Sequence, residues 1–475
     1  MDSYEVRKDR RNIRFALKAS FLAGTLLFLA WMGRSLARGS SLPVLIAIAL
    51  ISLLIIAPDP VRGLCVAYPV MFLIPYGILW FNFPLFNSPL DIVVMLTAGL
   101  GILRFVRHKR SLPKSGGIFP LLLVCIFILV GYALVGHGEV AGLRLFRFVQ
   151  GLWPFVLVLL LIETPKQAMK VLSVLLATFV LLSITWLPGL ITAGKIGGNI
   201  IRSANEAQEL GKGVTKISLA YVSGNLSYLT LLAIAFVAVM ALGWVIASKK
   251  ARFLTLVGTL LLCAVVIWSS YASALVALIS GVFILLLILM FSRTIKTFSV
   301  VSWLLFIVAA IALIVLILPQ GMTTMERIVK PSEDPSARSR MWAFSQGAQA
   351  FRANPLTGYG AYDRPKAVGG GYVLAGHNTF IALAYEFGLL FMLPYAMLFL
   401  MIARGFCQLI KRIKDKEDKV LAMSLAAVFG AAIITGFLTN VFLEPAQDAI
   451  IWLFVGLMTV WNGWLDRDHE ARLVE

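Results

Sequence analysis

Long apolar runs recur along this chain, and they constrain its fold more than any other feature. A helix needs about 20 mostly apolar residues to cross the hydrocarbon core of a membrane, where backbone polar groups must be satisfied internally. Runs of suitable character lie near residues 15–37, 42–57, 63–81, 90–106, 118–135, 147–163, 168–190, 217–247, 253–270, 272–291, 297–318, 378–404, 420–440 and 446–464. The sequence therefore predicts an all-α polytopic membrane protein with about 12–14 transmembrane helices.

Composition and charge exclude several other classes of protein. Only 14% of the residues are charged, whereas soluble domains have about 25%. The net charge of +19 lies largely in short runs between apolar segments, and these runs lack the interleaved aromatic residues that stack on bases, so we expect no nucleic-acid partner. The four cysteines are widely spaced without a CxxC pair, which indicates neither a zinc site nor a disulfide framework.

The basic runs predict how the chain is oriented. The positive-inside rule places residues 7–14 in the cytoplasm, and counting crossings then places the runs at 104–110, 249–252 and 411–419 on the same side. The first apolar run is long enough to span and has no clear cleavage site, so we expect a retained helix rather than a signal peptide. Both termini are predicted to be cytoplasmic.

Two outer segments are longer than hairpins, residues 191–216 and residues 319–377. The second holds seven Lys or Arg and four acidic residues, and a basic surplus outside runs against the usual trend. Long loops translocate whatever their charge; alternatively, the surplus binds an anionic ligand at the outer membrane face. Within this loop, residues 336–353 have helical character, with an apolar stripe of Met341, Phe344, Ala348 and Phe351. Residues 357–360 and 369–371 are expected to be flexible glycine turns.

His377 and a set of arginines are the candidate functional residues. His377 ends the large loop just before an apolar helix, where a histidine suits a base working near neutral pH or bonds to a neighbouring helix. Arg338 and Arg340 precede Trp342, and guanidinium groups bind phosphate with two parallel hydrogen bonds; a pair of solvated charges is the alternative. Arg147 and Arg202 can join the same electropositive patch.

Four short motifs in order resemble one known family. They are Arg338-Ser-Arg-Met-Trp342, Asn354-Pro-Leu-Thr-Gly-Tyr-Gly360, His377-Asn-Thr-Phe-Ile381 and Glu386-Phe-Gly-Leu-Leu390. Their order and spacing over roughly fifty residues are similar to the core of the O-antigen ligase and polymerase superfamily, as are the many helices and the large late outer loop. One departure is the patch Ser270-Tyr-Ala-Ser273, where many members carry a Ser-Arg pair.

The resemblance implies a fold of the membrane glycosyltransferase C type in the bacterial cytoplasmic (inner) membrane. It implies glycosyl transfer from a polyprenyl-diphosphate-linked glycan to lipid A–core sugar, as in a ligase, or to the next lipid-linked glycan, as in a polymerase. It further implies no cofactor, metal ion or ATP. His377 would be the catalytic base and Arg338, Arg340, Arg202 and Arg147 the diphosphate-binding residues, with Glu386, Asn378 and Trp342 supporting them.

The motifs divide the chain into three parts. Residues 1–216 are expected to form N-terminal transmembrane helices, residues 217–464 the ligase- or polymerase-like core, and residues 465–475 a cytoplasmic tail. A transporter or flippase for an anionic lipid-linked glycan is the alternative function. Transporters place charged residues in the helical midplane and often show repeated halves, whereas the polar groups here collect in one outer loop, which favours the enzyme.

Overall fold

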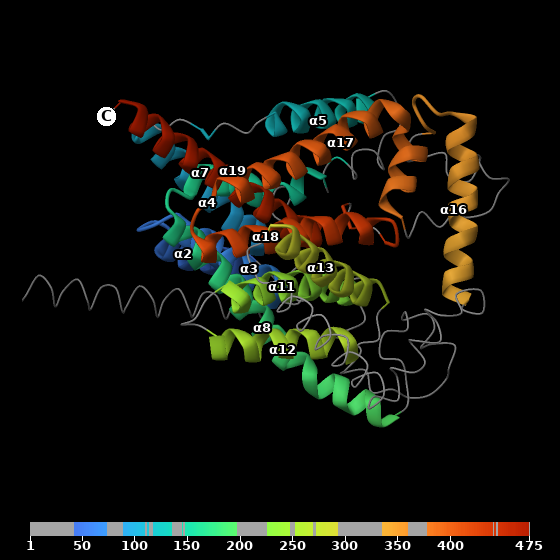
Figure 1. Ribbon diagram of the computed structural model, residues 1–475, viewed down its shortest axis with the longest axis horizontal. Coiled ribbons are helices and arrows are strands. Elements are labelled where there is room, and N and C mark those ends of the chain that lie inside the picture. The colour runs from blue at the N-terminus through green and yellow to red at the C-terminus, as the bar shows by residue number, and fades with distance from the viewer. Residues whose placement is uncertain are drawn as a thin grey trace, which may run out of the picture.

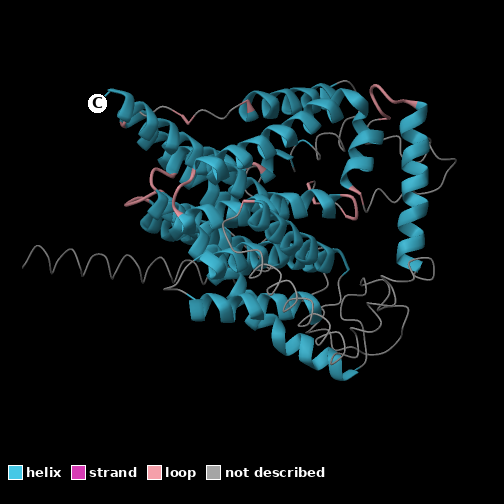
Figure 2. Ribbon diagram, in the orientation of Figure 1, coloured by secondary structure: helices cyan, strands magenta, loops and turns pink. Residues whose placement is uncertain are grey.

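All of the regular secondary structure in the described part of the chain is helical. The structure is a computed structural model that describes residues 42–73, 89–109, 112–113, 117–134, 145, 148–196, 226–247, 252–268, 272–292, 335–359, 378–439, 441–442 and 445–474. Within these ranges helices are joined by short loops, and no strand occurs (Figure 2). This confirms the predicted all-α polytopic class, while the total of about 12–14 crossings and the likeness to the membrane glycosyltransferase C type stay predictions.

The described helices overlap twelve of the fourteen predicted apolar runs. They are α2 (Leu42–Ile56), α3 (Val61–Leu73), α4 (Pro89–Arg107), α5 (Ile118–Leu134), α7 (Trp153–Leu161), α8 (Pro165–Ile196), α11 (Leu226–Ala247), α12 (Arg252–Trp268), α13 (Ala272–Phe291), α16 (Pro335–Ala353), α17 (Thr379–Arg412), α18 (Lys416–Gly436) and α19 (Pro445–Val474). Within α8, α13, α17, α18 and α19 lie five described segments long and apolar enough to cross a membrane. The predicted spans 15–37 and 297–318 lie outside the described residues.

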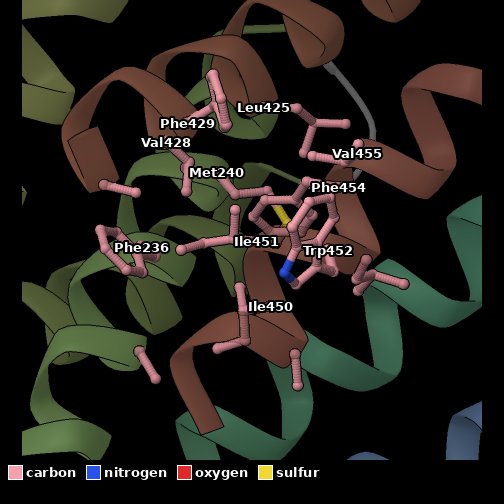
Figure 3. Close-up of a cluster of buried hydrophobic side chains, with 14 of the residues drawn as sticks. Phe236, Met240, Leu425, Val428, Phe429, Ile450, Ile451, Trp452, Phe454 and Val455 are labelled. Carbon is pink, nitrogen blue, oxygen red and sulfur yellow. The ribbon is translucent and has the colours of Figure 1, made fainter. Parts of the chain in front are cut away.

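The core of the bundle forms around α11, α18 and α19. Every residue of α11 from Leu231 to Met240 is fully buried, as expected for a helix that is apolar all round. Its Phe236 and Met240 lie in one cluster with side chains of α18 and α19 (Figure 3). Large apolar side chains on the outside of the bundle, such as Phe253 on α12 and Leu400 on α17, stay exposed, which suits contact with lipid chains.

Ion pairs join helix ends that the charge pattern assigns to one side. Arg104, near the end of α4, lies 3.3 Å from Asp59 and 3.4 Å from Glu163. Arg412, at the end of α17, lies 2.7 Å from Asp466 in α19. Arg104, Arg412 and Asp466 were predicted to lie on the cytoplasmic side. The alternation of helix directions is therefore consistent with the predicted crossings.

Several helices extend beyond their apolar runs. Helix α8 continues to Ile196, α17 to Arg412 and α19 to Val474, so much of the predicted tail 465–475 continues a helix. The apolar pattern marks only the stretch that lipid can surround, whereas a helix continues into water when its residues favour it. Hydropathy alone therefore underestimated the length of these elements.

Helix α16 lies across one end of the bundle, crosswise to the bundle helices (Figure 1). The predicted helix in the large loop is thus confirmed, but its predicted apolar stripe is partly wrong. Gly347 packs against α17, where an added Cβ would lie 2.5 Å from Ile381, and Ala350 is buried beside it. Met341 is 62% exposed. The small residues let the two helices approach closely. The spacing of apolar residues in the sequence could not predict this contact.

Candidate functional site

A compact turn follows α16 and contains most of the second motif. The Gly358 N–H donates to the carbonyl of Asn354 at 3.0 Å, and the Asn354 amide donates back to the carbonyl of Gly358. The Thr357 hydroxyl donates to Asn354 Oδ1 at 3.2 Å. These bonds make residues 354–359 an ordered turn. The predicted turn at 357–360 is therefore confirmed for its described residues, and it begins earlier, at Asn354.

The turn is joined to α17 at a break in that helix. Gly388 has φ +62° and ψ −165°, far from helical values. Across the break, the Tyr359 N–H donates to the carbonyl of Tyr385 at 2.8 Å. The N–H groups of Leu389 and Leu390 donate to Pro355 and Leu356 at 2.8 and 3.0 Å. We call the turn 354–359 and residues 385–390 of α17 the motif junction.

These hydrogen bonds replace helical hydrogen bonds that are lost at the break. A break removes the helical partners of nearby backbone groups, and a buried group left unpaired costs about 1–3 kcal/mol. The turn supplies donors and acceptors in their place. The break was not predicted, because Gly388 lies inside the apolar run 378–404 and a single glycine within a helical pattern is usually tolerated.

Two glycines make this close approach possible. Gly358 has φ +66°, and an added Cβ would lie 2.6 Å from the backbone carbon of Glu386. At Gly388 an added Cβ would lie 2.3 Å from the carbonyl oxygen of Leu356. Positive φ already favours glycine, and the opposing backbone leaves no room for a side chain. The glycines of the second and fourth motifs therefore both allow the same contact, the one between the turn 354–359 and α17.

Glu386 occupies the last turn before the break and is fully buried. The Tyr385 hydroxyl donates to its Oε1 at 3.4 Å. A buried acid inside a membrane helix is costly and usually functional. The structure thus places Glu386 at the motif junction, immediately beside the turn after α16.

The third motif fastens the start of α17 to the connection after α18. Asn378 caps α17: its Oδ1 accepts from the Ile381 N–H at 3.0 Å, and its amide donates to the carbonyl of Phe437 at 3.0 Å. The Thr379 hydroxyl donates to the carbonyl of Thr439 at 3.1 Å and accepts from the Val441 N–H at 3.0 Å. The residues that follow His377 are therefore tightly held.

The predicted site residues fall into three groups. Asn378, Glu386 and Trp342 have described side chains, and Trp342 is 44% exposed on α16. Arg338 and Arg340 lie in α16, but only the backbone is described there. His377, Arg147 and Arg202 lie outside the described residues, as do Ser270 and Tyr271. The structure brings α16 and the start of α17 together, and the assembly of the arginines around His377 stays a prediction.

Tyr132, near the end of α5, is a contact residue that sequence reasoning missed. Its hydroxyl donates to the carbonyls of Thr357 and Phe387, on the two halves of the motif junction. An isolated tyrosine in an apolar run carries no motif, so only the packing could reveal it. Among the described residues, no three His, Cys, Asp or Glu side chains form a group that could hold a metal ion.

Comparisons with known proteins bear on the same region. Residues 257–396 match a family model described as O-antigen ligase, a range that contains all four motifs. The match confirms the resemblance to the O-antigen ligase and polymerase superfamily, and it supports membrane glycosyl transfer as the general activity. A search of curated proteins finds no match.

Six chains of solved structures also match. One belongs to a structure described as "Structural coordination of polymerization and crosslinking by a peptidoglycan synthase complex". It is 16% identical, with a TM-score of 0.40, and the alignment covers 72% of this chain and 96% of that chain.

Proposed function

We propose, since residues 257–396 match a family model described as O-antigen ligase, that this protein transfers a glycan from a polyprenyl diphosphate to an acceptor sugar at the outer face of the bacterial cytoplasmic membrane. The acceptor is lipid A–core sugar or the next lipid-linked glycan. The motif junction is the observation that carries the proposal. It holds α16, which contains Arg338 and Arg340, against the start of α17, which follows His377 and contains Glu386.

The proposed chemistry is a displacement at the anomeric carbon of the donor sugar. The acceptor hydroxyl oxygen forms the new bond to this carbon as the bond to the diphosphate oxygen breaks. His377 accepts the hydroxyl proton, and polyprenyl diphosphate leaves with the bonding electrons. Because negative charge grows on the leaving group, fixed guanidinium groups stabilise it electrostatically. Arg338, Arg340, Arg202 and Arg147 are the proposed donors.

Glu386, Asn378 and Trp342 are proposed to support this site. Asn378 caps the first turn of α17. His377 therefore directly precedes a residue that is held in place. Glu386 presents a buried carboxyl at the junction itself. The exposed Trp342 follows the arginine pair on α16. Arginines stabilise diphosphate without a metal ion or nucleotide, so the proposal requires neither metal nor ATP.

A reconstituted reaction tests the function directly. Purified protein in lipid nanodiscs is incubated with a polyprenyl-diphosphate glycan and with each acceptor class, without ATP and with EDTA. We expect glycosylated acceptor and free polyprenyl diphosphate in equal amounts. In a parallel liposome assay, movement of intact donor across the bilayer without cleavage would instead support the transporter alternative. A requirement for added divalent metal would contradict the proposed metal independence.

Arg338→Lys is expected to lower transfer about tenfold, because lysine keeps the charge but cannot bind a phosphate with two parallel hydrogen bonds. The matched control is Arg352→Lys, since Arg352 lies in the last turn of the same helix and is exposed. Initial rates with saturating acceptor measure both variants. Equal rates for the two variants would remove Arg338 from the diphosphate site.

A further inference from the structure

Tyr132 is the contact residue of the motif junction that lies outside the matched range 257–396. Its hydroxyl donates to the carbonyl of Thr357 and, at 3.1 Å, to the carbonyl of Phe387. Its ring meets the ring of Phe387 edge to face, with centroids 5.1 Å apart. One side chain of α5 therefore touches both halves of the junction.

The two carbonyls belong to backbone that is irregular at this point. Thr357 precedes Gly358, and Phe387 precedes Gly388, and both glycines have positive φ. Neither segment is held by the regular bonding of a helix there. A donor shared between the two carbonyls fixes their separation.

We infer that Tyr132 is a positioning residue for glycan transfer, which it assists by clamping the turn 354–359 to the break in α17. The clamp fixes where α16 and its arginines stand relative to Glu386 and the start of α17. This inference rests on the proposed function. Misplacing reacting groups by about 1 Å can cost a hundredfold in rate, so loss of one clamping bond is enough to matter.

Tyr132→Phe removes the hydroxyl and keeps the ring against Phe387. The matched control is Tyr68→Phe, because the Tyr68 hydroxyl also donates to a backbone carbonyl, that of Ala449, at 3.2 Å. Tyr68 lies in α3 and its partner in α19, away from the motif junction. Both variants thus lose one tyrosine hydroxyl that donates to backbone carbonyl oxygen, and we expect similar, small falls in the midpoint of thermal unfolding.

Amide hydrogen exchange tests the clamp without any assay of activity. In Tyr132→Phe the amides of Tyr359, Leu389 and Leu390, which bridge the junction, are expected to exchange about fivefold faster, as loss of one net hydrogen bond allows. In Tyr68→Phe they are expected to be unchanged. Equal exchange of these amides in both variants would overturn the clamp.

Transfer rates then test the positioning role. We expect kcat to fall roughly tenfold in Tyr132→Phe with the KM for donor little changed, and neither to change in Tyr68→Phe. Faster exchange with an unchanged kcat would overturn the positioning role and leave the proposed function intact. If the unsubstituted protein forms no product, the proposed function fails, and with it the role in transfer, whereas the exchange result still reports on the clamp.

Discussion

Replacing His377 with alanine is expected to lower the rate of glycan transfer by about a thousandfold, because a positioned general base contributes 10²–10⁴-fold. The acceptor hydroxyl then has no group to take its proton as the new bond forms. Folding should be preserved, since the cap on α17 is made by Asn378 and not by His377. Initial rates of acceptor glycosylation, measured on purified protein at matched concentration, give the size of the effect.

His137→Ala is the control for this experiment, because His137 lies in the short segment between the predicted spans 118–135 and 147–163 and belongs to none of the four motifs. Its transfer rate should equal that of the unsubstituted protein. Normal transfer by His377→Ala would show that another group accepts the proton. Loss of membrane-inserted protein in His377→Ala would instead point to a structural role for this histidine.

Gly388→Ala is expected to give the largest loss of stability at the site, about 3 kcal/mol or more in the free energy of unfolding. The new Cβ would lie 2.3 Å from the carbonyl oxygen of Leu356, and alanine disfavours the φ of +62° found there. Backbone on both sides must move, so the bonds from Leu389 and Leu390 to the turn are lost. The midpoint of thermal unfolding and the rate of transfer should fall together.

Gly99→Ala is the matched control, because an added Cβ at Gly99 in α4 meets nothing within 4 Å. Alanine favours the helix by about 1 kcal/mol over glycine, so its unfolding midpoint should stay level or rise. If Gly388→Ala unfolds like the unsubstituted protein, α17 accepts a continuous helix through this position. The motif junction would then be dispensable for the fold.

The motif junction gives a physical meaning to motifs that otherwise stand apart in the sequence. Asn354 closes the turn, Gly358 and Gly388 let two backbones meet, and Glu386 is buried beside them. Asn378 and Thr379 tie the start of α17 to the connection after α18. Many of the motif residues thus hold α16, α17 and the connection after α18 together. The proposed chemistry is carried out by other residues on these segments.

The amino-acid sequence by itself indicated that lipid surrounds most of the protein, where helices form, and that the protein is an all-α membrane protein. Lipid offers no hydrogen-bond partners, so a long apolar run that crosses it satisfies its backbone by forming a helix, and α5, α13 and α18 lie close to their predicted ranges. The four motifs predicted the resemblance to the O-antigen ligase and polymerase superfamily, because their order is a property of the chain itself. His377, Arg338 and Arg340 were likewise chosen by residue type and position alone, and their roles stay predictions.

Only the tertiary structure decided how these pieces meet. Apolar periodicity records which residues avoid water, and it does not record backbone hydrogen bonds between segments distant in the chain. It therefore missed the break at Gly388, the bonds that join the turn 354–359 to α17 and the contact from Tyr132, which lies 225 residues before Thr357. Apolar periodicity also placed Met341 on the packing face of α16, where Gly347 and Ala350 lie instead. Close contact between helices depends on small residues rather than on hydrophobicity.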